Sequence, residues 1–141
     1  MARIYVVTKG TRKVNAFTTW LARRGLGKQV VLTTTGRKSG KPRSVPVSPL
    51  DIRDTGYIVS PYGEVEWVKN VRADRNVRLR HGRNDRKVTL AEVPVARRGI
   101  LLHQYWNEQR ITRPYFDVPR DPKPEDFAVV AESHPVFKIV T

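Results

Sequence analysis

The feature that most constrains this fold is a series of short β-branched segments between residues 29 and 95, separated by turns that carry glycine and proline. The run QVVLTTT at residues 29–35 is typical of a strand. The turn at residues 82–85 joins the strands on either side of it as a hairpin. Because these segments do not alternate regularly with helices, they predict an α+β fold or a small barrel with mostly antiparallel strands. Strands are predicted at residues 29–35, 42–52, 57–61, 77–81, 87–95 and 136–140.

Two of these strands carry further information about their place in the sheet. Pro42, Pro46 and Pro49 have no backbone N–H to give to a ladder, so their strand is expected at an edge or on an irregular path. In a later strand, Val77 and Leu79 share one face and the arginines between and beside them share the other. The sequence therefore predicts one polar and one apolar face for that part of the sheet.

Apolar side chains at helical spacing supply the remaining elements. Val14, Phe17 and Leu21 recur with a helical period in the first of them. In the last, Ile100 and Leu102 are expected near one apolar face. Helices are predicted at residues 11–24, 65–73 and 96–110, and a proline-rich loop at residues 112–125.

The positive charge of the chain indicates the kind of partner it binds. It has 27 Lys and Arg against 13 Asp and Glu, a formal net charge of +14. Residues 1–50 contain eleven of the bases and no acid, so most of the excess is in the first third of the chain. Such a balance favours nucleic acid, an acidic membrane surface or a phosphorylated small molecule as partner. A solubilising face that binds no ligand is the alternative.

Other features of the composition exclude whole classes of function. The chain has no cysteine, which excludes disulfides, thiolate metal sites and cysteine nucleophiles. No apolar stretch approaches the roughly 18 residues of a membrane span, and the first residues have no signal-peptide core. His81, His103 and His134 have no metal-ligand spacing, so no metal site is expected. We therefore expect a single cytoplasmic domain over residues 1–141.

The sharpest local motif is TTTGRKSGKPR at residues 33–43, which has four cations within seven residues. Gly36 and Gly40 let the backbone turn tightly and expose its N–H groups, and the hydroxyls nearby add donors. Such a segment suits a phosphate or a carboxylate. It is not a Walker loop, because the two glycines are too close and Pro42 stands where Ser or Thr would bind magnesium. A solvated basic hairpin turn is the competing interpretation.

A second motif is SPYGE at residues 60–64, followed by Trp67 and Asn70. Packing of the helix against the sheet would account for Trp67. Asn70, on the same short helix, is harder to explain by packing. A planar ligand held against an aromatic wall, with polar groups at its rim, would use such a set.

Taken together, TTTGRKSGKPRSVPV and YIVSPYGEVEWVKNVRADRNVRL resemble the F420-dependent deazaflavin nitroreductase family of actinobacteria. The resemblance covers about residues 14–95, and the segments RPYFDVP and HPVFKIV more loosely. It implies a split β-barrel of the FMN-binding type and coenzyme F420, a deazaflavin with a phospholactyl oligoglutamate tail. It also implies hydride transfer from the reduced cofactor to a small unsaturated or nitro-type substrate. A homodimer and a peripheral membrane contact are compatible with it, and no specific nucleic-acid partner is expected.

The resemblance also assigns site residues. Tyr115 is the candidate catalytic residue, as a tyrosine of the substrate pocket. The residues expected to bind the phosphate and tail are Arg37, Lys38, Ser39, Gly40, Lys41 and Arg43. Those expected around the deazaflavin ring are Val45, Pro46, Val59, Ser60, Pro61, Tyr62, Trp67 and Asn70.

The chain departs from that family on the substrate side. Nitroimidazole-reducing members have a tyrosine where this chain has Ser48, and a longer loop where it has only residues 63–66. Two alternatives follow for the function. One is a split-barrel reductase that uses FMN, and the other is a non-enzymatic domain that binds nucleic acid through its basic face.

Overall fold

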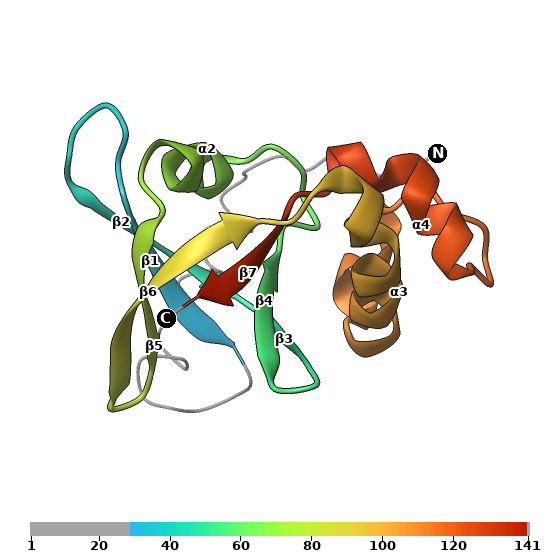
Figure 1. The fold of residues 1–141 in the computed structure, drawn as a ribbon, viewed down its shortest axis with the longest axis horizontal. Coiled ribbons are helices and arrows are strands. Elements are labelled where there is room, and N and C mark those ends of the chain that lie inside the picture. The colour runs from blue at the N-terminus through green and yellow to red at the C-terminus, as the bar shows by residue number, and fades with distance from the viewer. Residues whose placement is uncertain (1–28, 141) are drawn as a thin grey trace.

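The computed structural model describes residues 29–140, which form a seven-stranded antiparallel sheet curled into half a barrel (Figure 1). The strand order is β2-β1-β5-β6-β7-β4-β3. The helix predicted at residues 11–24 lies outside the described residues. None of the helices within residues 29–140 is long and apolar enough to cross a membrane. The strands are β1 (Val30–Thr35), β2 (Pro42–Val47), β3 (Pro49–Ile52), β4 (Thr55–Val59), β5 (Asn76–His81), β6 (Asn84–Glu92) and β7 (Val136–Val140).

The strand predicted at residues 42–52 is broken, and the break closes the half-barrel. β2 ends at Val47 and β3 begins at Pro49, yet these two strands are the opposite edges of the sheet. Because Ser48 alone separates them, the sheet must curl until its edges come together. The edge position predicted from the prolines is confirmed, since a missing N–H at an outer edge leaves the ladder intact.

β5 and β6 form the predicted hairpin around Gly82, which has a positive φ of 61°. β6 begins at residue 84 and ends at residue 92, against 87 and 95 in the prediction. Val77 and Leu79 are buried and the arginines beside them are exposed, so the predicted alternation is confirmed. β7 has the predicted bounds.

α2 (Glu66–Ala73) lies over the end of the curled sheet and closes the first core cluster (Figure 1). Trp67, Val68 and Val71 are buried and pack with strand residues such as Leu32. The ring of Trp67 lies 5.6 Å from that of Phe137, centroid to centroid. The short helix predicted at residues 65–73 is confirmed, and its apolar face accounts for the burial of Trp67.

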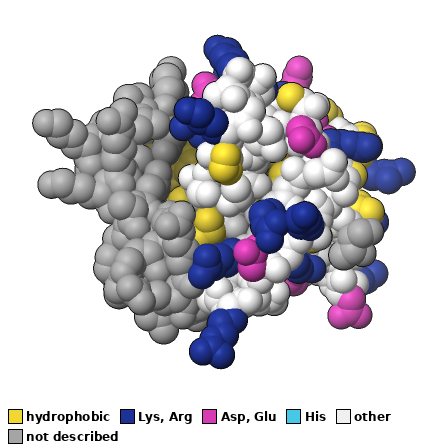
Figure 2. Space-filling view, turned by 90° about the vertical axis from the view of Figure 1, so that its left-hand side faces the viewer, with side chains coloured by type: hydrophobic (Ala, Val, Ile, Leu, Met, Phe, Trp, Pro, Cys, Tyr) yellow, Lys and Arg dark blue, Asp and Glu magenta, His cyan; other side chains and the backbone are white. Residues whose placement is uncertain are grey.

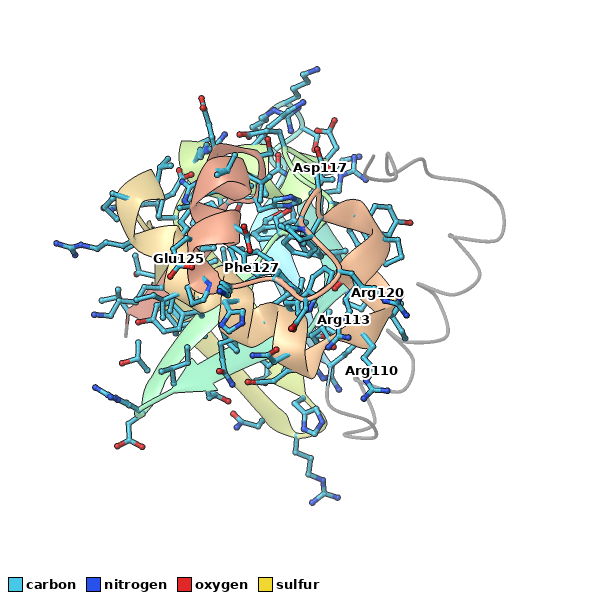
Figure 3. The ribbon with its side chains drawn as sticks, turned by 90° about the vertical axis from the view of Figure 1, so that its right-hand side faces the viewer. Arg110, Arg113, Asp117, Arg120, Glu125 and Phe127 are labelled. Carbon is cyan, nitrogen blue, oxygen red and sulfur yellow. The ribbon has the colours of Figure 1, made fainter. Side chains whose placement is uncertain are left out.

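The second core cluster lies between the sheet and the helices η1 (Val95–Arg97), α3 (Arg98–Glu108) and α4 (Pro124–Val130). Phe127 of α4 points inward from the helical side (Figure 3) and is fully buried. Leu102 of α3 is buried as predicted, but the expectation for Ile100 is wrong, because its side chain is 72% exposed. The reason is the neighbouring Gly99, where a Cβ would lie 3.2 Å from the Pro124 carbonyl oxygen. α3 meets α4 at Gly99, and Ile100 therefore points away.

The loop predicted at residues 112–125 is also wrong in part. It contains most of the 3₁₀ helix η2 (Arg110–Tyr115) and the start of α4, and η3 (Ala131–Ser133) follows. Pro124 lies in the first turn of α4 and is followed by Glu125 and Asp126, a pattern typical of a helix start. The loop was predicted because the segment is rich in proline. The backbone N–H of Lys123 donates to the Asp126 carboxylate at 2.8 Å, which completes that start.

Candidate functional site

The turn between β1 and β2 is a tight loop that projects from the sheet (upper left in Figure 1), and its cations are exposed. The Gly36 N–H donates to the Lys41 carbonyl and the Gly40 N–H to the Gly36 carbonyl, both at 2.8 Å. Gly40 has a φ of +71°, and a Cβ on Gly36 would lie 2.8 Å from Ser39 Oγ. Both glycines are therefore required by the turn itself.

Three cations of this turn have no acidic partner within residues 29–140. Lys38, Lys41 and Arg43 are exposed, and no carboxylate of residues 29–140 lies within ion-pair distance of them. Figure 2 looks onto this side of the molecule and shows Lys and Arg side chains projecting from it. Uncompensated cations on a rigid turn favour an anion. We call residues 36–43 the basic turn.

Asn70 joins the basic turn to α2. Its side chain is buried, and its Oδ1 accepts from the Arg37 backbone N–H at 3.2 Å and from Arg37 Nη1 at 2.8 Å. Its Nδ2 donates to Thr34 Oγ1 at 3.2 Å. A buried amide costs free energy unless it is hydrogen-bonded, and these three bonds satisfy it. Asn70, which packing did not explain, therefore links α2 to the basic turn by hydrogen bonds.

β2 divides the residues expected to bind the cofactor between its two faces. Arg43 pairs with Thr34 and Val45 with Leu32, so both point to the α2 side. Pro46 pairs with Val31 and points to the other side. The structure therefore brings Arg43 and Val45 together with Asn70 and leaves Pro46 apart from them.

The loop from β4 to α2 forms a second, more buried turn at residues 60–64. Ser60 Oγ donates to the Gly63 carbonyl at 2.6 Å, and the Ser60 N–H donates to the Pro135 carbonyl at 2.8 Å. Pro61 is buried, and the side chain of Val59 packs in the second core cluster. Of the residues expected to approach a ring, Val59 therefore contributes to the core.

Tyr62 and Tyr115 are brought together from distant parts of the chain. Their rings meet edge to face, with centroids 4.8 Å apart. Both are half-buried, whereas the nearby Tyr105 is 3% exposed, and burial raises its phenol pKa well above the usual range. The half-buried pair offers an aromatic surface that a planar molecule can reach. We call Tyr62 and Tyr115 the tyrosine pair.

His134 adjoins this turn, although its spacing in the sequence gave no sign of it. Its ring stacks on Phe116 with centroids 4.2 Å apart, and it is 5% exposed. Within the described residues its Nδ1 has no hydrogen-bond partner. Burial lowers the His134 pKa, against an opposing effect of the Ser60 and Pro61 backbone. A buried imidazole with a lowered pKa therefore adjoins the loop that carries Tyr62.

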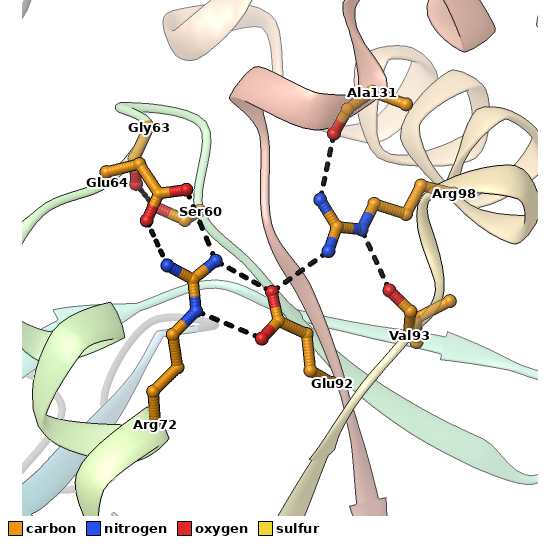
Figure 4. Close-up of polar contacts among 8 residues, drawn as sticks. All are labelled: Ser60, Gly63, Glu64, Arg72, Glu92, Val93, Arg98 and Ala131. Carbon is orange, nitrogen blue, oxygen red and sulfur yellow. Dashed lines mark hydrogen bonds and ion pairs between the residues drawn. The ribbon is translucent and has the colours of Figure 1, made fainter.

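A chain of ion pairs holds the second turn in place (Figure 4). Arg72 of α2 pairs with Glu64 of the turn and, at 2.8 Å, with Glu92 of β6. Glu92 also accepts from Arg98 at 2.9 Å. Arg98 is 4% exposed and donates to the carbonyls of Val93 and Ala131 as well. This network connects the turn, α2, the sheet and α3, and holds the pKa of Glu92 below its usual range, chiefly through Arg72.

A hollow of about 510 Å³ lies along β1, β5 and β6 and reaches Asp74 at the end of α2. It is bordered by Thr33, Arg78 and Lys87, which face each other across β1, β5 and β6. Asp85 lies 3.3 Å from Arg78 and offsets its charge. This hollow shares with the basic turn only residues at the base of the loop, Gly40 and Pro42.

The curled sheet places the chain among split-barrel proteins that resemble pyridoxamine phosphate oxidases. Similar solved structures include a candidate pyridoxamine 5′-phosphate oxidase from Listeria innocua, with 18% identity, a TM-score of 0.54, and 81% of this chain and 83% of that chain covered. The general stress protein 26 of Bacillus anthracis has 15% identity and a TM-score of 0.57, with 87% and 85% covered. An FAD-binding protein from Mesorhizobium loti has 16% identity and a TM-score of 0.52, with 89% and 88% covered.

Within that class the family is defined by sequence. The model of the F420H(2)-dependent quinone reductase family matches residues 4–133, and the chain belongs to this family. No curated protein matches the sequence significantly. The F420-dependent class expected from the motifs is therefore confirmed, and the protein is an oxidoreductase. The family is described by quinone rather than nitro reduction.

Proposed function

We propose that this protein transfers a hydride from reduced coenzyme F420 to a small, planar, unsaturated acceptor, with a quinone as the first choice and a nitro compound as the second. The observation that carries the proposal is the basic turn, in a chain of this family: its glycines shape the loop, and three of its cations have no acidic partner among the described residues. A phosphate with a polycarboxylate tail is the kind of ligand such a turn suits.

The residues present fit the anionic part of that cofactor. Lys38, Lys41 and Arg43 supply charge, and Ser39 supplies a hydroxyl at the tip of the turn. Asn70 fixes the turn against α2, so the cations are presented on a rigid base rather than on a mobile loop. Trp67 is 9% exposed and supports the site mainly by packing. Arg43 and Val45 share the face of β2 that points to the α2 side, so this face is the proposed side for the deazaflavin ring.

The tyrosine pair is the proposed acceptor side. When bound, F420 supplies the hydride, and the protein then has to position the acceptor and provide a proton. Tyr115 is our candidate proton donor, because its phenol is half-buried and its ring is fixed against Tyr62. Ser60 and Gly63 hold the loop of Tyr62 by the hydrogen bond between them.

FMN is the second candidate cofactor. Split-barrel relatives with this fold include a protein described as FAD-binding, and the phosphate of FMN would also suit the basic turn. FMN has a single phosphate, whereas F420 adds a chain of carboxylates, so the two ligands differ in charge. F420 binding is therefore expected to weaken more steeply with salt.

The test is a fluorescence titration of the protein with oxidised F420 and with FMN at two salt concentrations. We expect saturable F420 binding at micromolar or tighter Kd, and oxidation of reduced F420 when a simple quinone is added. Binding of FMN without binding of F420 at low salt would overturn the cofactor assignment. Turnover of a nitroaromatic but not of the quinone would reverse our order of substrates.

A further inference from the structure

Arg37 differs from the other cations of the basic turn because it already has an anionic partner. Its Nη1 lies 2.6 Å from Glu66 Oε2 and donates to Asn70 Oδ1 at 2.8 Å. The Arg37 side chain is 25% exposed. Lys38, Lys41 and Arg43 have no anionic partner in the described part of the chain. The turn therefore presents three available cations and one that is neutralised.

The two bonds of Arg37 have different characters. Asn70 is buried and holds the arginine through both its backbone N–H and its side chain. The side chain of Glu66 is 74% exposed, at the first position of α2, and within residues 29–140 it has no hydrogen-bond partner besides Arg37. An exposed ion pair of this kind is weak and easily exchanged. A second anion can therefore replace Glu66 while Asn70 keeps the guanidinium in place.

We infer that Glu66 is an internal counter-ion of the basic turn, which occupies Arg37 until the anionic end of the ligand displaces it, and which thereby sets the affinity of the site. The inference rests on the proposed function. It makes Glu66 an affinity-determining residue that opposes binding in two ways. It competes directly for Arg37, and its charge repels any anion that approaches Lys38.

The experiment measures the Kd of oxidised F420 for the wild-type protein, Glu66→Gln and the matched control Glu125→Gln. Glu125 is an exposed first-turn glutamate of α4, on the helical side away from the turn (Figures 1 and 3), and its variant makes the same change in net charge. We expect Glu66→Gln to tighten binding about two- to five-fold at low salt, the size of an exposed ion pair, and Glu125→Gln to leave it unchanged. The gain shrinks as salt screens both charges.

A double-mutant cycle separates competition for Arg37 from a general charge effect. In an Arg37→Gln background, Glu66→Gln is expected to give less than half of its wild-type gain. A full gain in that background would overturn the role of Arg37, and weaker binding by Glu66→Gln would show that Glu66 orders the site instead. Wild-type protein that fails to bind F420 would refute the proposed function and this inference with it. Wild-type binding with no gain in Glu66→Gln would refute the inference alone.

Discussion

The two turns that flank α2 differ in how their charged groups are used. The basic turn has cations that are exposed and, apart from Arg37, unpaired within residues 29–140. The turn at residues 60–64 is hydrogen-bonded within itself and anchored by Arg72 to Glu64. A cation without an acidic partner in the folded protein can bind an anionic ligand. A cation that is already ion-paired instead holds the elements it connects in a fixed position. The same residue type, arginine, thus supports binding on one side of α2 and architecture on the other.

The largest effect is expected where the network is buried. Arg98→Met removes three hydrogen bonds at once and leaves the Val93 carbonyl without its Arg98 donor, while the Ala131 carbonyl keeps the His134 N–H. We expect a loss of about 2–4 kcal/mol in the free energy of unfolding, below the full value for a buried pair because Glu92 is 30% exposed. Urea denaturation measures it. Arg97→Met, an exposed neighbour, is expected to change stability by less than about 0.5 kcal/mol.

Equal free energies of unfolding for the two variants would contradict a structural role of the network, because Arg98 would then contribute no more than a surface arginine. Weaker packing of the tyrosine pair in Arg98→Met would support that role further. Near-ultraviolet circular dichroism reports that packing, since Tyr62 lies on the loop that the network anchors.

The second prediction tests what the anchored turn holds. Tyr115→Phe keeps the ring contact with Tyr62 and removes the hydroxyl. If Tyr115 donates the proton, kcat for quinone reduction falls about 100-fold, which is the lower range for general acid catalysis. The F420 Kd is expected to stay within two-fold of wild type. An unchanged kcat would leave Tyr115 as a packing residue and make solvent the proton source.

The third prediction concerns the basic turn itself. Arg43→Ala and Lys38→Ala are each expected to weaken F420 binding by about 1–3 kcal/mol, the range for a lost charged hydrogen bond. Both residues are exposed, so stability is expected to change by less than about 0.5 kcal/mol. Arg86→Ala, also exposed but on β6, serves as the control for total charge. Equal loss in all three variants would mean that the overall charge of the protein, not the turn, attracts the cofactor.

The sequence predicted the parts of this arrangement that depend on local pattern. The strand at residues 29–35, the short helix that carries Trp67 and the final strand follow from periodicity, and the glycines of the basic turn follow from their required geometry. The hydrogen bonds between Asn70 and Arg37 could not be predicted from the sequence, because they join residues 33 positions apart. Nor could the break at Ser48, since only the closed sheet shows that one predicted strand supplies both edges.

The same distinction explains the errors in the helical region. Prolines suggested a loop, but Pro124 begins a helix, and its partner α3 approaches it at Gly99. The tyrosine pair lies at the border of that region, so its assembly depends on tertiary packing of η2. Contacts between distant motifs therefore depend on tertiary packing that a local sequence pattern does not show.

The smallest effect is expected from His134, beneath the anchored turn. Burial lowers its pKa from an ordinary value of 6.5, so the unfolded chain binds the proton more readily than the folded one. Stability from the neutral ring is thus complete above pH 6.5 and decreases as the pH falls below it, by at most about 1.4 kcal/mol per pH unit. His134→Phe, which retains the stacking on Phe116, is expected to reduce the change of the unfolding free energy between pH 6.5 and 5.

The carboxylates of the network titrate at lower pH, because Arg72 holds the pKa of Glu92 below 4.5. Urea denaturation measured at steps of half a pH unit separates the two contributions. A slope that persists in His134→Phe would show that another group titrates in this range and that His134 does not set the pH dependence of stability.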